Sequence, residues 1–151
     1  MNLRAELMAA SFQEESMEKL LDSTLDSVDL ADQAAIDFAR KVGFDEDDQN
    51  SISMAVRECM VNAIAHGNQY NSRKKVYLKL EAHPDSLLIT IGDEGNGFDE
   101  NAVPDPLAQD NLLRQSGRGL LLMRAFMDEC EHSARSPSGT LVRLVKRLHE
   151  S

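Results

Sequence analysis

The sequence contains no tryptophan, and its aromatic side chains are limited to two tyrosines and five phenylalanines among 151 residues. A core with so few rings has to be built from aliphatic side chains and from methionine, of which the chain has seven. Long apolar segments are missing as well, because no run reaches the roughly 18 residues that a membrane-spanning helix needs. The first residues are also too acidic and interrupted for a signal peptide. We therefore expect a cytoplasmic protein.

Cysteine and positive charge are both in short supply. The two cysteines, Cys59 and Cys130, lack the spacing of metal ligands, which argues against a zinc site or a disulfide scaffold and fits a reducing compartment. The 26 Asp and Glu outnumber the 16 Lys and Arg and give a formal net charge of −10. An acidic surface does not attract nucleic-acid phosphates or anionic membranes, so we expect neither as a partner. It suits a basic partner, or an anionic ligand offset by a metal ion, although solubility alone also explains it.

The length fits one domain, which we expect over residues 17–151, with residues 1–16 forming either a helical extension or a loose tail. The hydrophobic patterns predict a strand over 17–24, a helix over 27–44 ending at Gly43, and a helix from 45–49 to His66. They further predict a hairpin over 75–97, a polar connection over 99–116 that is long enough to be a functional lid, a helix from 117, and a closing hairpin to 148. This order favours a two-layer α+β sandwich over a parallel βαβ fold. The apolar positions expected to face the core are Leu30, Ala34, Ile36, Phe38 and Val42 in the first helix and Ile52, Ala55, Val56, Cys59, Ala63 and Ile64 in the second.

Three polar residues interrupt the second helix at four-residue intervals: Glu58, Asn62 and His66. Four residues advance an α-helix by 400°, so successive members lie about 40° apart and form one stripe beside the apolar face. Such a stripe can be a solvated helix edge. It can equally supply a general base from Glu58 and an amide oxygen from Asn62 for a hard cation that keeps most of its ligands on substrate phosphates.

Two glycine-containing stretches follow the stripe. In "GDEGNGFD", Asp93 stands just after an apolar strand, where its carboxylate can accept a hydrogen bond from an exocyclic amino group, while the glycines allow a flat ring to approach. The alternative is a tight turn. In "SGRGLLLM", Gly117 and Gly119 stand at the start of a predicted helix, with Arg118 between them, and the free amides of a helix start attract phosphate. The alternative there is a flexible junction.

The order of these features resembles that of the GHKL ATPases, which include histidine kinases, type II topoisomerases, mismatch-repair ATPases and heat-shock chaperones. "ECMVNAIAHGN" is similar to their N box, "DEGNGFD" to the first glycine box and "GRGLLLMRAFMDE" to the second. Within this group the chain looks most like the stand-alone anti-sigma-factor serine kinases of bacteria, over roughly residues 17–148. The resemblance implies the Bergerat fold, in which helices cover one face of a mixed, mostly antiparallel sheet.

The resemblance also implies roles for matching positions. Glu58 would be the base that activates the acceptor, Asn62 the Mg²⁺ ligand, and Asp93 the partner of the adenine amino group. Gly95 and Gly97 would shape the adenine pocket, and Thr140 would bind the base through a water. The other positions expected in the ATP site are Ala65, His66, Phe98, Gly117, Arg118, Gly119 and Leu120.

The function implied is an ATP-binding anti-sigma regulatory factor that phosphorylates a Ser or Thr of an anti-sigma-factor antagonist. Its partners would be ATP with Mg²⁺, a sigma factor and the antagonist, and family members commonly form homodimers. Two alternatives remain open at this point. One is a non-catalytic module that uses ATP only to switch partners, and the other is a plain ATP hydrolase.

Overall fold

The computed structural model describes residues 12–95 and 123–149. Within them the elements follow in the order β1 (Glu15–Asp22), α2 (Asp26–Val42), α3 (Glu46–Val61), the π-helical segment η1 (Asn62–Gly67), β2 (Lys75–His83), β3 (Ser86–Gly92), β4 (Glu129–Ala134) and β5 (Thr140–Arg147). The predicted extension lies mostly outside the described residues. The predicted connection over 99–116 lies entirely outside them.

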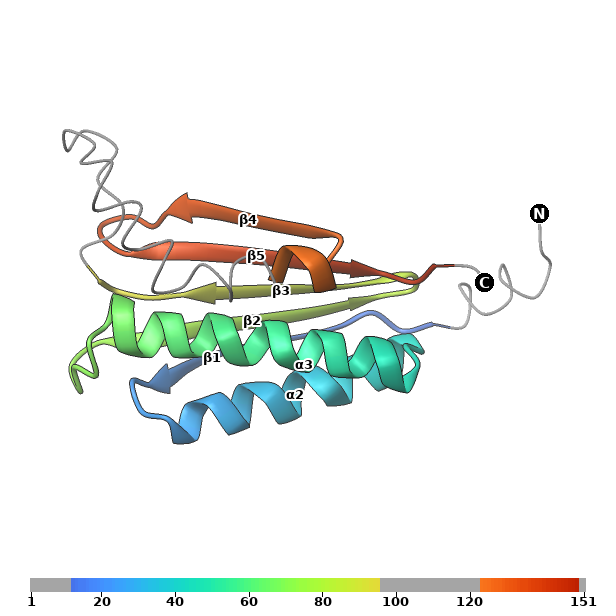
Figure 1. Ribbon diagram of the computed structural model, residues 1–151, viewed down its shortest axis with the longest axis horizontal. Coiled ribbons are helices and arrows are strands. Elements are labelled where there is room, and N and C mark those ends of the chain that lie inside the picture. Colours follow the sequence, from blue (N-terminus) through green and yellow to red (C-terminus); the bar gives the residue numbers. More distant parts are fainter. Residues whose placement is uncertain (1–11, 96–122, 150–151) are drawn as a thin grey trace.

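The five strands form one sheet in the order β1-β2-β3-β5-β4, and every neighbouring pair is antiparallel. Helices α2 and α3 lie side by side across one face of this sheet (Figure 1). The predicted α+β fold with two layers is thereby confirmed. No helix in the described part of the chain combines the length and the apolar character needed to cross a bilayer.

The core lies between the two layers. Alternate residues of β2 and β3 are buried beneath the helices, as a half-buried strand pattern predicts. All six residues predicted for the inner face of the second helix are buried as well. The prediction for α2 is partly wrong, because Leu30 is 62% exposed. Small side chains form much of the inner face of α2. A search for large apolar residues therefore assigns that face to the wrong side of the helix. The buried hydrophobic residues of α2 are Val28, Ala31, Ala35, Phe38, Ala39 and Val42.

The helix ends follow the local signals in the sequence. Gly43 closes α2 in the left-handed conformation with φ 104°, and its N–H donates to the carbonyls of Ala39 and Arg40. Asp45 caps α3 by accepting a hydrogen bond of 2.8 Å from the amide of Asp48. The acidic run at 45–49 is therefore a helix start, as predicted.

The third predicted helix ends earlier than expected. Residues 123–126 are helical, but β4 has already begun at Glu129, and Cys130 pairs with Leu144 of β5. Pairing with β5 starts at Asp128, whose amide donates to the Val145 carbonyl at 2.8 Å. Backbone pairing with a strand that follows later in the chain therefore overrides the helical pattern of the local sequence.

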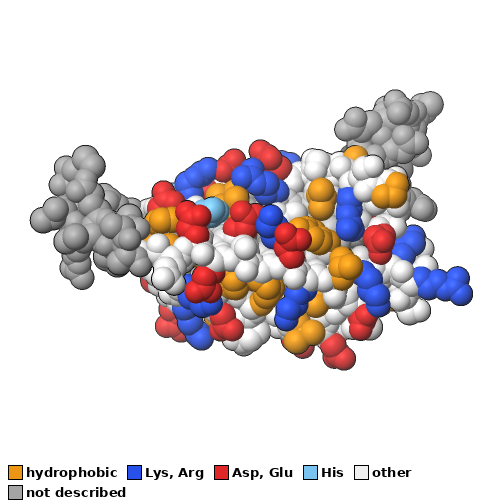
Figure 2. Space-filling view, turned by 180° about the vertical axis from the view of Figure 1, so that it is seen from behind, with side chains coloured by type: hydrophobic (Ala, Val, Ile, Leu, Met, Phe, Trp, Pro, Cys, Tyr) orange, Lys and Arg blue, Asp and Glu red, His pale blue; other side chains and the backbone are white. Residues whose placement is uncertain are grey.

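The sheet face opposite the helices carries interspersed charges with single apolar side chains between them (Figure 2). Strand register brings Glu18, Lys79, Arg143 and Glu131 into one row across this face. Lys79 lies 3.7 Å from Glu18, and Arg143 lies 3.9 Å from Glu131. Exposed pairs of this kind add little stability. They keep the face polar.

Candidate functional site

The polar stripe crosses a change in helix type. At Asn62 helix α3 passes into η1, where the amide of Asn68 donates to the carbonyl of Ala63, five residues earlier, at 2.8 Å. π-Helical turns of this kind occur frequently at functional sites. Glu58 and Asn62 are half-buried, whereas His66 is exposed.

The carboxylate of Asp93 is held just beyond the end of β3. Its Oδ1 accepts hydrogen bonds from the amides of Gly95 at 2.9 Å and Thr140 at 3.2 Å. The amide of Asp93 in turn donates to the Thr140 carbonyl at 3.0 Å. The structure therefore brings Asp93, Gly95 and Thr140 together. No donor within the described residues reaches Oδ2.

Asp93 is kept in this position at an electrostatic cost. The residue is only 8% exposed. Burial raises the pKa of its carboxyl group above the ordinary value, although the hydrogen bonds from Gly95 and Thr140 act in the opposite direction. A buried carboxylate with a raised pKa, and with no donor to Oδ2 among the described residues, is a candidate functional group.

The end of η1 lies directly against the turn that contains Asp93. A Cβ atom placed on Gly67 would lie 2.4 Å from Oδ2 of Asp93. A Cβ on Gly95 would lie 2.3 Å from the carbonyl oxygen of Gly67. Both positions need glycine, because neither contact leaves room for a side chain. The stretch "NAIAHG" and the stretch "DEG" thus meet in space, and together they form one edge of a single site.

The sequence matches the histidine kinase-like ATPase domain family over residues 21–146. The chain belongs to this ATPase family. It is 35% identical to the anti-sigma F factor of Bacillus subtilis over 107 residues, which cover 70% of this chain and 73% of that relative. The anti-sigma F factor of Priestia megaterium is 35% identical over 108 residues, covering 70% and 74%. That of Oceanobacillus iheyensis is 34% identical over 107 residues, covering 70% and 73%.

Family membership confirms the resemblance seen in the sequence, and it identifies ATP as the ligand of the domain. The roles of individual residues stay predictions. Ala65 lies half-buried in η1, between Asn62 and the Gly67 contact with Asp93. The predicted positions that lie outside the described residues are Gly97, Phe98, Gly117, Arg118, Gly119 and Leu120.

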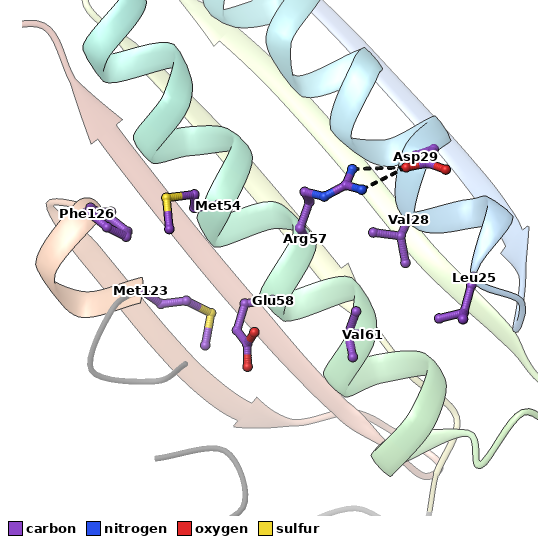
Figure 3. A pocket seen from close by; sticks show the side chains of 9 residues that line it. All are labelled: Leu25, Val28, Asp29, Met54, Arg57, Glu58, Val61, Met123 and Phe126. Carbon is purple, nitrogen blue, oxygen red and sulfur yellow. Dashed lines mark hydrogen bonds and ion pairs between the residues drawn. The ribbon is translucent and has the colours of Figure 1, made fainter. Parts of the chain in front are cut away.

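Glu58 of the ATPase domain lines a pocket of about 470 Å³. Figure 3 shows its carboxylate on the side of α3 that faces Met123, whereas the neighbouring Arg57 points toward α2. Arg57 is bound by Asp29 at 2.9 Å and by Asp32 at 2.7 Å, and these hydrogen bonds raise the pKa of its guanidinium. Glu58 forms no ion pair within the described residues. The remaining lining residues are Leu25, Val28, Met54, Val61 and Phe126.

The donor groups of the site fit a metal ion that arrives with the nucleotide. No cluster of three or more His, Cys, Asp or Glu residues in the described part of the chain could hold a metal by itself. Mg²⁺ commonly takes one or two protein oxygens and completes its shell with waters and substrate phosphates. The side-chain amide of the half-buried Asn62 offers one oxygen donor of this kind.

Two residues near Asp93 escaped the sequence analysis. Arg135 donates from Nη1 to the backbone carbonyl of Asp93 at 3.0 Å, and its guanidinium lies 5.6 Å from the ring centre of Tyr77. Asn68 is 1% exposed and reaches the residue after Asp93. The contact of Arg135 with Asp93 depends on the register of the sheet, and no spacing in the sequence indicates it. For Asn68 the sequence did contain a signal, since an asparagine directly after "HG" stands at the predicted end of the helix.

Gly67→Ala is expected to weaken ATP binding by about tenfold or more, because the added methyl group displaces the Asp93 carboxylate and a hydrogen bond to a charged group is lost. Gly43→Ala is the matched control. Gly43 has φ 104° and no atom within 4 Å of the added carbon, so this change strains the backbone by about 1 kcal/mol and leaves ATP binding unchanged. Calorimetric titration with ATP, together with thermal melts, separates the two effects. Wild-type affinity in Gly67→Ala would contradict the proposed contact.

Proposed function

We propose that this ATPase domain is an anti-sigma regulatory factor that phosphorylates a Ser or Thr of an anti-sigma-factor antagonist protein. The anti-sigma role is supported by family membership and by relatives that are named anti-sigma F factors. The kinase activity is supported chiefly by one observation. The carboxylate of Glu58 forms no ion pair within the described residues, and Glu58 stands four residues before Asn62 in the chain.

In this proposal the site has two ends. At the base end, Oδ2 of Asp93 accepts a hydrogen bond from the exocyclic amino group of adenine, and Gly95 and Thr140 hold the other oxygen. At the phosphate end, Asn62 contributes its amide oxygen to Mg²⁺, which offsets charge on the phosphates when it is bound. His66, at the exposed end of η1, shapes the phosphate end without taking part in the chemistry.

The proposed reaction is a direct phosphoryl transfer. The hydroxyl oxygen of the acceptor Ser or Thr forms a bond to the γ-phosphorus of ATP. The bond from that phosphorus to the β–γ bridging oxygen breaks, and ADP leaves. Glu58 takes the hydroxyl proton. Positioning and electrostatic stabilisation supply most of the catalysis in reactions of this class.

The proposed partners are a sigma factor and the antagonist, which bind in different states of a cytoplasmic homodimer. The formal net charge of −10 suits a partner with a basic surface and offers no general attraction to nucleic acid. The division into an extension at 1–16 and an ATP-binding domain at 17–151 remains part of the proposal.

The kinase proposal is tested by incubating the full chain with γ-labelled ATP, Mg²⁺ and the antagonist encoded in the same genome. Label is expected on a serine or threonine of the antagonist. Tight ATP binding without labelled protein would show a non-catalytic partner switch instead. Phosphate release that needs no protein acceptor would show a plain hydrolase.

A further inference from the structure

Asn68 stands directly after η1 and is 1% exposed. Its side-chain amide joins three segments that are distant in the sequence. Oδ1 accepts from the amide of Glu94 at 2.7 Å, and Nδ2 donates to the Lys75 carbonyl at 3.1 Å and to Ser23 Oγ at 2.9 Å. Replacing this buried amide with an apolar side chain would leave its partners without their hydrogen bonds.

These contacts form a closed ring between η1, the start of β2 and the turn after β3. The amide of Lys75 donates to Oε2 of Glu94 at 2.5 Å, while the Lys75 carbonyl accepts from Asn68. Glu94 is thereby held through both its backbone and its side chain. Because Glu94 follows Asp93 directly, the ring holds the residue next to the proposed adenine-binding carboxylate.

The peptide bond between Asp93 and Glu94 is held from two sides. Its N–H donates to Oδ1 of Asn68 at 2.7 Å, and its C=O accepts from Nη1 of Arg135 at 3.0 Å. Asn68 comes from the end of the helix layer, and Arg135 comes from the β4–β5 connection, where its guanidinium also packs on Tyr77. The plane of this peptide sets ψ of Asp93, and it thereby helps to fix the backbone from which the carboxylate projects.

We propose that Asn68 and Arg135 are positioning residues that select adenine by fixing the direction of Oδ2 of Asp93. The inference rests on the proposed role of Asp93 in binding the adenine amino group. Hydrogen bonds weaken steeply as their angle departs from linear, so a rotated peptide would cost recognition of the base while the phosphate contacts remain. Asn68 and Arg135 act through Asp93 and need no contact with the nucleotide.

The test compares ATP with inosine triphosphate, in which a carbonyl oxygen replaces the exocyclic amino group. The wild-type chain is expected to prefer ATP by about tenfold or more, the effect of one hydrogen bond to a charged acceptor. Asn68→Ala and Arg135→Ala are each expected to remove most of that preference. The readout is the ratio of the dissociation constants for the two nucleotides, because a general loss of stability weakens the binding of both alike.

Two control variants separate positioning from structural support. Ser23→Ala removes one partner of Asn68 Nδ2 but leaves the bond to Glu94, so it is expected to lower Tm and keep the nucleotide ratio. Arg143→Ala removes an exposed arginine that pairs with Glu131 on the same sheet, and it is also expected to keep the ratio. If Asn68→Ala does not fold, Arg135→Ala provides the test, because Arg135 is only half-buried and holds the other side of the same peptide.

Asp93→Asn distinguishes failure of this inference from failure of the proposed function. If Asp93→Asn leaves the nucleotide ratio at its wild-type value, Asp93 does not read the adenine amino group, and both ideas fall. If Asp93→Asn removes the preference while a folded Asn68→Ala or Arg135→Ala variant keeps it within about twofold, positioning by that residue is overturned and the role of Asp93 stands.

Discussion

Glu58→Gln is expected to lower the rate of phosphoryl transfer to the antagonist by about 100-fold or more, with ATP binding nearly unchanged. Removal of a general base costs about 10²–10⁴-fold in rate, and glutamine keeps the shape of the side chain while losing its ability to take a proton. Glu58 forms no ion pair within the described residues, so the substitution breaks no salt bridge there. Transfer at saturating ATP and the ATP dissociation constant are measured separately.

Glu46→Gln is the matched control for this experiment. Glu46 is exposed in the first turn of the same helix, α3, and lies outside the pocket that contains Glu58. The control variant is expected to transfer phosphate at the wild-type rate. Normal transfer in Glu58→Gln would show that Glu58 is not the base, and family membership would be unaffected by that result.

Local patterns were sufficient to predict the elements that hold the site. Alternation in β2 and the i, i+3, i+4 spacing in α3 predict which side chains are buried, because each depends only on the geometry of its own element. The helix stop at Gly43 and the cap at Asp45 are local for the same reason. The order of motifs then predicted the ATPase family, although each motif alone had an ordinary structural explanation.

Contacts between distant segments could not be predicted in this way. Arg135 reaches the Asp93 carbonyl because β5 pairs with β3 in one particular register, and no spacing in the sequence specifies that register. The helix predicted from residue 117 is shorter than expected for the same reason, because β4 begins to pair with β5 at Glu129, before the predicted helix end. The π-helical segment η1 also depends on tertiary packing. It brings Gly67 against Asp93, where only a glycine fits.

Asp93→Asn is expected to weaken ATP binding by about tenfold or more and, at the same time, to raise the Tm of the nucleotide-free chain at neutral pH. Asparagine Oδ1 can keep the hydrogen bonds from Gly95 and Thr140. Its Nδ2 then stands where Oδ2 was and presents a donor to the amino group of adenine, so a hydrogen bond to a charged acceptor is lost. Stability rises because the substitution removes a buried charge.

The sign of the pH dependence follows from the pKa of Asp93, which burial raises above its unfolded value. Above the folded pKa, the ionised carboxylate lowers the free energy of unfolding. This cost is relieved as the pH falls through the folded pKa toward the unfolded value. The gain in Tm from Asp93→Asn is therefore expected to be largest at neutral pH and to shrink as the solution is acidified.

Asp128→Asn provides a comparison of opposite sign. Burial tends to raise the pKa of Asp128, but hydrogen bonds from the Arg147 amide and the His149 ring outweigh it and hold the pKa below the ordinary value. Its ionised form therefore stabilises the fold, and this contribution is lost as the pH falls through the depressed pKa. Asp128→Asn is expected to lower Tm at neutral pH without changing ATP affinity. If Asp93→Asn also lowered Tm at neutral pH, its carboxylate would be a structural group rather than one held at a cost for ligand binding.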